Sequence, residues 1–228
     1  KAAAWANNRD LVLRWVDSEE VEQGDIKTLL EDVDAMIVPG GFGIRGTEGK
    51  IKAIQYAREN KIPFLGICLG MQLATVEFAR NVAGVAQATS QEFIDEGDES
   101  KDKIKGCVIH IMEDQKVVKD KGGTMRLGGW DNVLTTGTRA HDAYGSREIR
   151  ERHRHRYEFN NAFREQLTKA GLVISGTTPD ESLVEIVELA DHPWFVGVQF
   201  HPEFTSRPTK GHPLFNSFMA AAVASKSV

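Results

Sequence analysis

A glycine-flanked cysteine between an apolar run and a helical pattern constrains the fold of this chain most strongly. The run Ile62–Ile67 (IPFLGI) has the composition of a buried strand, and turn-spaced apolar residues from Leu69 onward predict a buried helix. Gly66 and Gly70 permit the sharp turn that joins a strand directly to a helix. We therefore expect Cys68 at the carboxyl end of a parallel strand, where such sheets hold their ligands.

The same order of strand, glycine turn and helix occurs once earlier, which is typical of parallel βαβ units. Ala35–Val38 (AMIV) predicts the strand, Gly40–Gly46 the turn, and the spacing of Ile51–Arg58 the helix. A further strand is expected at Leu11–Val16 (LVLRWV). This half of the chain therefore predicts a parallel sheet with helices packed on it.

The second half has a different pattern. Leu183–Leu189 (LVEIVEL) and Trp194–Phe200 (WFVGVQF) are separated by a short turn and predict an antiparallel hairpin. A helix is expected over residues 214–222, and the polar stretch Asp95–Lys105 is expected to be an exposed loop. Because there is no internal repeat or low-complexity linker, the economical interpretation is one domain with a mixed sheet.

Cys68 is a candidate nucleophile. A helix that starts beside the sulfur favours the thiolate, which is the reactive form, so a lowered pKa is expected. The alternative is a small buried cysteine with a packing role, and we assign that role to Cys107, which lacks flanking glycines.

His201 is the candidate acid–base partner, because it ends an apolar strand in the sequence Gln199–Glu203 (QFHPE). In an extended chain, residues two apart face the same side, so Glu203 could hold the imidazole and complete a Cys–His–Glu triad. A histidine and a glutamate bonded to solvent at a strand end are the alternative.

Two further segments carry several interpretations. The turn Pro39–Gly43 could bind phosphate, contribute to an oxyanion hole or simply form a tight turn, and the chain has no Walker A sequence. Arg147–Arg156 (REIRERHRHR) holds five arginines and two histidines. In extended form Arg152, Arg154 and Arg156 share one side, which suits a solvated face, carboxylate binding or RNA contact. The two histidines lack a third metal ligand at a convincing spacing.

Charge and cysteine content limit the function classes. The formal net charge of −5 argues against nucleic acid as the main partner. The sequence has no secretory signal and no apolar run of about 18 residues, so no membrane span is expected. Two isolated cysteines suggest a reducing, cytoplasmic setting.

Several of these motifs resemble a known family. Gly66–Gln72 (GICLGMQ) and Gln199–Phe204 (QFHPEF) resemble the class I, triad-type glutamine amidotransferase domains. Pro39–Gly46, Gly122–Gly128 and Arg152–Asn160 resemble the glutaminase domain of the CTP synthase family. The resemblance implies an α/β, flavodoxin-like three-layer fold, with a mostly parallel central sheet and added antiparallel strands, as a single domain over residues 1–228.

The resemblance also implies a role for individual residues in hydrolysing L-glutamine to glutamate and ammonia. Cys68 attacks the carboxamide and forms a thioester, and His201, oriented by Glu203, moves protons. The backbone N–H groups of Gly41 and Leu69 form the oxyanion hole. The substrate is held by Gly41, Leu69, Gln72, Glu92 and Arg156, and no metal site is implied.

In that family an N-terminal synthase domain uses the ammonia to aminate UTP to CTP. The synthase domain is not contained in these residues, so we expect them to be a piece of a longer enzyme. ATP, Mg and GTP are implied only for the full-length enzyme, which is expected to be a homo-oligomer, and no cofactor is implied for glutamine hydrolysis. The alternatives are a γ-glutamyl or peptide hydrolase on the same scaffold, or a non-catalytic phosphate- or RNA-binding module.

Overall fold

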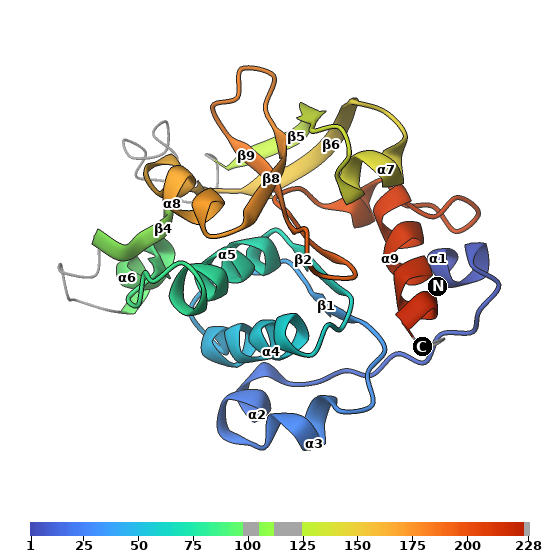
Figure 1. The fold of residues 1–228 in the computed structure, drawn as a ribbon, viewed down its shortest axis with the longest axis horizontal. Helices are drawn as coiled ribbons and strands as arrows, with labels where there is room; N and C mark the ends of the chain where they lie inside the picture. The colour runs from blue at the N-terminus through green and yellow to red at the C-terminus, as the bar shows by residue number, and fades with distance from the viewer. Residues whose placement is uncertain (98–104, 112–124, 226–228) are drawn as a thin grey trace.

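A seven-stranded sheet with helices on both faces organises the chain (Figure 1). The computed structural model describes residues 1–97, 105–111 and 125–225. The strands of this sheet follow the order β1 (Met36–Val38), β2 (Phe64–Ile67), β10 (Phe195–Val198), β9 (Val184–Leu189), β8 (Leu172–Thr177), β5 (Arg126–Leu134) and β6 (Glu148–His155). A second, three-stranded sheet has the order β3 (Thr89–Ser90), β4 (Cys107–Ile111) and β7 (Tyr157–Phe159).

Helices and short 3₁₀ turns connect these strands. They are α1 (Ala2–Ala6), α2 (Ser18–Gln23), α3 (Ile26–Leu30), α4 (Thr47–Glu59), α5 (Leu69–Asn81), α6 (Gln91–Gly97), α7 (Arg139–Tyr144), η3 (Asn161–Phe163), α8 (Arg164–Lys169), η4 (Pro202–Phe204) and α9 (Pro213–Ser225). The expected strands, hairpin and helices around β1, β2, α4, α5, β9, β10 and α9 are therefore confirmed.

The three-layer α/β fold is confirmed, but the sheet is less parallel than expected. Only β1 with β2, and β2 with β10, pair in parallel. The other four pairings, which join β10, β9, β8, β5 and β6, are antiparallel. The reason is that β9 and β10 form a hairpin and that the chain returns after α7 to pair β6 antiparallel with β5, so neither connection is the crossover that a parallel pair requires.

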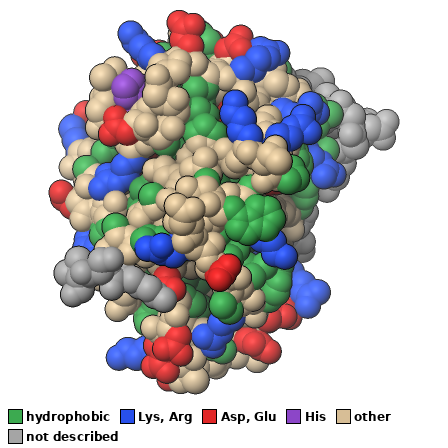
Figure 2. Space-filling view, turned by 90° about the vertical axis from the view of Figure 1, so that its right-hand side faces the viewer, with side chains coloured by type: hydrophobic (Ala, Val, Ile, Leu, Met, Phe, Trp, Pro, Cys, Tyr) green, Lys and Arg blue, Asp and Glu red, His purple; other side chains and the backbone are tan. Residues whose placement is uncertain are grey.

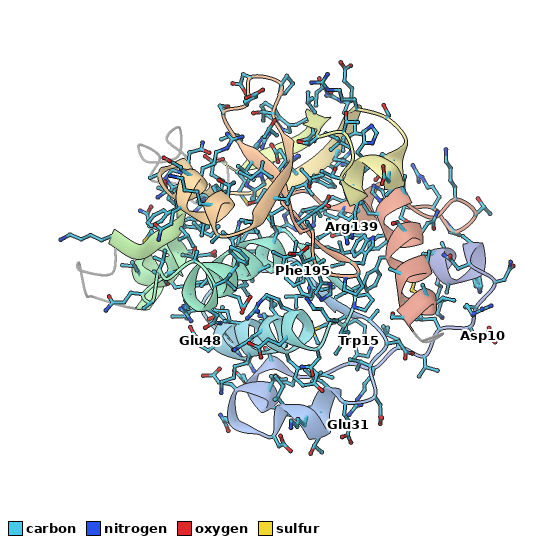
Figure 3. The ribbon with its side chains drawn as sticks, viewed as in Figure 1. Asp10, Trp15, Glu31, Glu48, Arg139 and Phe195 are labelled. Atoms are coloured by element: carbon cyan, nitrogen blue, oxygen red, sulfur yellow. The ribbon has the colours of Figure 1, made fainter. Side chains whose placement is uncertain are left out.

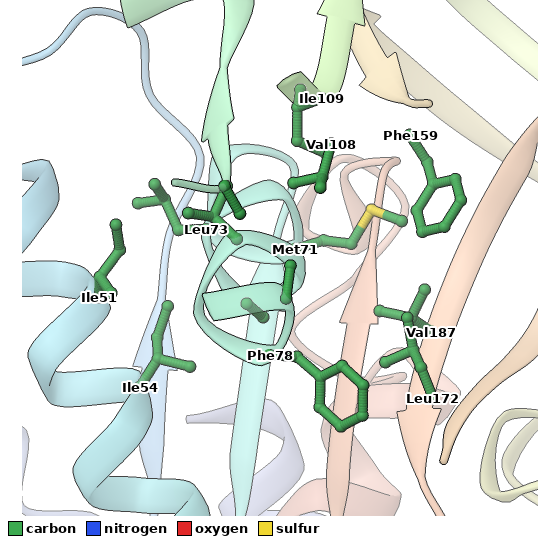
Figure 4. Packing of buried hydrophobic residues seen from close by; sticks show 14 of the residues in the cluster. Ile51, Ile54, Met71, Leu73, Phe78, Val108, Ile109, Phe159, Leu172 and Val187 are labelled. Carbon is green, nitrogen blue, oxygen red and sulfur yellow. The ribbon is translucent and has the colours of Figure 1, made fainter. Parts of the chain in front are cut away.

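Alternating side chains of β2 supply the two faces of the core. Phe64 packs with the cluster that contains α4 and α5, and its ring stacks on Phe195 with centroids 4.4 Å apart. Leu65 and Ile67 pack on the opposite side, in the cluster that contains α9 and α7. Figure 4 shows Ile54 of α4 and Leu73 of α5 in the first cluster. A strand buried on both faces explains why Ile62–Ile67 is continuously apolar.

The prediction of a strand at Leu11–Val16 is wrong. The segment is an extended connection between α1 and α2, and Val12 and Trp15 are 92% and 85% exposed. Figure 3 labels Trp15 on this connection, and Figure 2 shows hydrophobic side chains exposed among charged ones on the face that carries α1 and α9. Within the described residues β1 pairs only with β2, so no strand lies beside the segment to bind its backbone.

Two expectations fall partly beyond the described residues. Residues 98–104 of the polar stretch Asp95–Lys105 lie outside them, while α6 extends into its beginning. Residues 122–124 of the motif Gly122–Gly128 also lie outside them. Among the helices that the structure describes, none is long and apolar enough to cross a bilayer.

Replacing Phe195 with alanine should lower the free energy of unfolding by about 3–5 kcal/mol, because the ring is fully packed between α5 and the sheet. Trp15→Ala serves as the matched control and should change it by less than about 0.5 kcal/mol, because that side chain is exposed. Urea unfolding followed by circular dichroism measures both. Equal losses of unfolding free energy in the two variants would show that the segment of residues 11–16 is packed.

Candidate active site

The turn between β2 and α5 holds Cys68 in a strained conformation. Its φ is +51° and its ψ is −103°, a region that non-glycine residues rarely occupy. A Cβ on Gly66 would lie 2.7 Å from the Gly70 backbone, and one on Gly70 would collide with the carbonyl oxygen of Val38. Both glycines are therefore needed for α5 to start directly against the ends of β1 and β2.

Cys68 is buried, and the residue is 2% exposed. The pKa of the thiol is raised to about 12, mainly by burial and to a smaller extent by the carboxylates of Glu92 and Glu203. The Leu69 N–H and the Gln199 amide act in the opposite direction. The expected lowering of this pKa is therefore wrong, because desolvation of the thiolate outweighs the helix terminus. The thiol is protonated at neutral pH and lies 3.9 Å from the Arg154 carbonyl oxygen, which accepts its hydrogen bond.

The structure brings His201 and Glu203 together, with 2.6 Å between Nδ1 and Oε1. His201 immediately precedes the 3₁₀ turn η4, and Glu203 lies within it. The two residues therefore pair across this turn and not, as expected, along an extended chain. The backbone N–H of His201 donates to the Arg152 carbonyl oxygen at 2.8 Å, and the Phe204 ring stacks on the imidazole. Because the carboxylate accepts from Nδ1–H, the lone pair lies on Nε2. Nε2 is buried and has no hydrogen-bond partner among the described residues, so it can accept a proton.

The glycine turn after β1 lies against both side chains. A Cβ on Gly40 would stand 2.8 Å from His201 Cε1 and 3.5 Å from Cys68 Cβ, so only glycine fits there. A Cβ on Gly41 would be 3.3 Å from the Leu69 side chain. Gly41 and Leu69 are therefore neighbours, and the role of their N–H groups as oxyanion donors stays a prediction.

The remaining predicted substrate residues surround this centre. Glu92 is buried at the start of α6, and its Oε1 accepts a 2.9 Å hydrogen bond from the Gly43 N–H. Gln72, in α5, donates from Nε2 to the Tyr157 carbonyl oxygen at 2.9 Å. Arg156 is half-buried in the bend between β6 and β7. Glu92 is thus bonded to the glycine turn that follows β1, and Gln72 to the first residue of β7.

The expected arginine face is only partly correct. Arg152 and Arg154 are exposed on β6, and the Arg154 guanidinium lies 5.9 Å from the Phe42 ring centroid. Arg156 lies beyond the end of β6, where the chain bends, and does not continue that face. Arg156 therefore has a different environment from Arg152 and Arg154, which face solvent.

The two histidines of the same segment face inward and are buried. Burial lowers the pKa of His153 to about 2 and that of His155 to about 3, so both are neutral. Their rings are joined by a 3.0 Å Nδ1–Nε2 contact. The described residues contain no group of three side chains that could hold a metal ion.

Sequence reasoning missed two residues of this centre, Gly40 and Gln199. Gln199 is 1% exposed, and its Nε2 lies 3.8 Å from the Cys68 sulfur. The alternation that placed Glu203 beside His201 also applies to Gln199, two residues before it, and was the available signal. The contact of Gly40 with His201 depends on strand order, which no local pattern encodes.

Comparison with known sequences identifies relatives over nearly the whole chain. A family model described as glutamine amidotransferase class-I matches residues 3–221. A CTP synthase of Geobacter metallireducens is 60% identical over 96% of this chain, and one of Clostridium acetobutylicum is 57% identical over 97%. The chain spans 39% and 40% of the length of these two relatives.

Solved structures agree in fold. The glutaminase domain of Trypanosoma brucei CTPS, solved with bound acivicin, superimposes with a TM-score of 0.86 and is 41% identical. The match covers 98% of this chain and 84% of that one. A glutamine amidotransferase of Thermotoga maritima, at a TM-score of 0.56 and 12% identity, shares the fold over 97% of this chain and 88% of its own.

Alkylation of Cys68 by iodoacetamide, a small neutral reagent, should accelerate about tenfold per pH unit from pH 8 to 11, because the thiolate fraction rises in that proportion below the pKa. In denaturant, which removes the burial, the rate should level off near the ordinary thiol pKa. Mass spectrometry of the Cys68 peptide from a Cys107→Ala protein measures the rate. A plateau in the folded protein below pH 9 would contradict a raised pKa.

Proposed function

The chain belongs to the class-I glutamine amidotransferases and, within them, to the glutaminase domains of the CTP synthases, and from this membership we propose that Cys68, His201 and Glu203 hydrolyse L-glutamine to glutamate and ammonia. The observation that carries the proposal is the available acceptor Nε2 of His201, held by Glu203 beside a buried cysteine in a strained turn. Strained turns of this kind, with a positive φ at the central residue, present nucleophiles in related α/β folds.

In the proposed first step, the sulfur attacks the carboxamide carbon of glutamine while its proton passes to His201 Nε2. Because burial raises the pKa of Cys68, the free site holds the thiol, and we propose that His201 takes the proton as the sulfur attacks. The carbonyl oxygen becomes an oxyanion, which the Gly41 and Leu69 N–H groups stabilise. When the carbonyl re-forms, the C–N bond breaks and His201 returns the proton to the departing ammonia, leaving a thioester.

In the second step, a water molecule attacks the thioester and gives its proton to His201. The C–S bond then breaks, glutamate leaves, and the thiol regains its proton. Glu203 remains an acceptor for Nδ1–H throughout and stabilises the imidazolium. The half-reaction therefore needs only water besides these side chains.

We assign the recognition of free glutamine to Glu92 and Arg156, together with Gln72. A carboxylate suits the α-ammonium, and an arginine suits the α-carboxylate. The relative from T. brucei binds acivicin, a glutamine analogue, which supports a glutamine site on this fold.

The chain spans about two-fifths of its curated relatives, so the wider reaction is part of the proposal. In a longer protein the ammonia would pass to a synthase domain that aminates UTP to CTP with ATP, Mg and GTP, in a homo-oligomer. Both cysteines are free in the structure, which suits the proposed cytoplasmic location.

Two alternatives make different demands on the site. A γ-glutamyl or peptide hydrolase would need the same triad. It would not need side chains that bind both the α-ammonium and the α-carboxylate of a free amino acid. A phosphate- or RNA-binding module would need neither the strained cysteine nor the His201–Glu203 pair. The triad therefore favours an enzyme over a binding module, and Glu92 and Arg156, as the assigned partners of the two charged ends, favour free glutamine as the substrate.

The protein, assayed at high enzyme concentration, should release ammonia from L-glutamine, and Cys68→Ala should abolish the release, because the reaction proceeds through the Cys68 thioester. Cys107→Ala is the matched control and should retain activity if the protein stays folded. Coupled detection of ammonia and glutamate measures the reaction. Equal activity of the Cys68→Ala protein would exclude the proposed nucleophile.

Replacing Arg156 with alanine should raise the KM for glutamine by about tenfold or more, because one charged hydrogen bond to the α-carboxylate is lost. Arg152→Ala, an exposed neighbour on β6, should change KM by less than about threefold. Steady-state kinetics separate the two variants. An increase for Arg152→Ala alone would assign the carboxylate contact to the strand face instead.

A further inference from the structure

We propose that Gln199 is a catalytic residue of this site: its side-chain amide, fixed in one orientation by Gln72, donates a hydrogen bond to the Cys68 sulfur and stabilises the thiolate that forms during attack. The inference rests on the proposed function, because it assigns a task to the sulfur that the proposed reaction uses. It adds to the triad a donor that approaches the sulfur from β10.

Gln199 is anchored firmly where β10 ends. Its backbone N–H donates to the Glu185 carbonyl of β9 at 2.9 Å, and its side chain is almost fully buried. The side-chain Nε2 lies 3.8 Å from Cys68 Sγ, within reach of an N–H···S hydrogen bond. The opposite end of the amide, Oε1, lies 3.3 Å from Gln72 Nε2. The amide therefore bridges the reactive sulfur and α5.

The surrounding groups determine which end of the amide faces the sulfur. The Tyr157 carbonyl can only accept, so the Gln72 group 2.9 Å from it must be the NH₂. The second hydrogen of that NH₂ points at Gln199, where it needs an acceptor, so Oε1 of Gln199 must lie there. The NH₂ of Gln199 consequently faces the sulfur. Rotating it by 180° would place two NH₂ groups against each other and an oxygen against the developing thiolate.

The sulfur needs this donor because its other neighbours favour the protonated thiol. The Arg154 carbonyl accepts from S–H, and Glu92 and Glu203 both disfavour a second negative charge. The Leu69 N–H and the Gln199 amide are the groups that act for the thiolate. A hydrogen bond to an ionised acceptor is about twice as strong as one to a neutral acceptor, so the contribution of Gln199 grows as the proton leaves. Such differential binding lowers the barrier to attack.

The proposal is tested with Gln199→Met, which keeps the length of the side chain and removes the donor, and with Gln199→Glu, which also places a carboxylate at the sulfur. Two readouts are needed: the pH profile of Cys68 alkylation by iodoacetamide, and kcat and KM for glutamine. Gln166→Met is the matched control, because Gln166 is exposed and its side chain donates to the Ala83 carbonyl, away from the sulfur. Thermal unfolding verifies that each variant is folded.

We expect Gln199→Met to slow alkylation at fixed pH by about tenfold to a hundredfold, the range for one hydrogen bond to a charged group. The pH profile should move upward, kcat should fall by a similar factor, and KM should change less than about threefold. Gln199→Glu should be slower still. Unchanged alkylation and kcat in a folded Gln199→Met protein would overturn the proposal, as would a fall in kcat without movement of the pH profile.

A measurement that leaves Gln199 unaltered tests the proposal even if the Gln199 variants fail to fold. The Gln199 side-chain ¹⁵N–¹H resonances, assigned through bonds at neutral pH, should shift when Cys68 is replaced by alanine, because the N–H group then loses its sulfur acceptor, whereas the Gln166 resonances should not shift. Gln199 resonances that are unchanged in the Cys68→Ala protein overturn the proposal. If the pH profile moves in the variants but the unaltered protein releases no ammonia, the proposed function fails while the Gln199–sulfur contact stands.

Discussion

The site depends on the close approach of three parallel strand ends. Val38 pairs with Gly66, and Ile67 with Val198, so β1, β2 and β10 end side by side. Because they run in the same direction, the chain leaving each strand reaches one edge of the sheet. That edge collects the glycine turn, Cys68 and the segment from Gln199 to His201. The antiparallel half of the sheet supplies supports, such as the carbonyls of Arg152 and Arg154.

This arrangement places the Cys68 thiol in a buried environment that keeps it protonated until substrate enters. Burial raises the pKa of Cys68, and burial lowers those of His153 and His155 behind it. A buried thiol is protected from adventitious alkylation, and its charge appears only when His201 removes the proton. Fixed donors from Leu69 and Gln199 then act on a charge that develops in place, which is the condition under which electrostatic stabilisation is strongest.

Local patterns predicted the parts of the molecule that local sequence determines. The turn around Cys68 and the hairpin of β9 and β10 follow from glycine placement and alternation. Leu11–Val16 has the composition of a strand, but a strand exists only where a neighbour binds its backbone, and composition carries no such information. The pKa of Cys68 depends on the whole protein that surrounds it. Gln199 and Gly40 acquire their contacts through strand order, which becomes visible only in three dimensions.

The central claim, that Cys68 is the nucleophile in a reaction with free glutamine, is tested most directly by trapping the acyl-enzyme. The protein is mixed with L-glutamine, quenched in acid within one turnover, digested and analysed by mass spectrometry. If Cys68 is the nucleophile, we expect one γ-glutamyl group on the Cys68 peptide, absent when His201 is replaced by alanine and lost on exposure to hydroxylamine, as thioesters are. Ammonia release with no adduct on Cys68, or an adduct on Cys107, would contradict it.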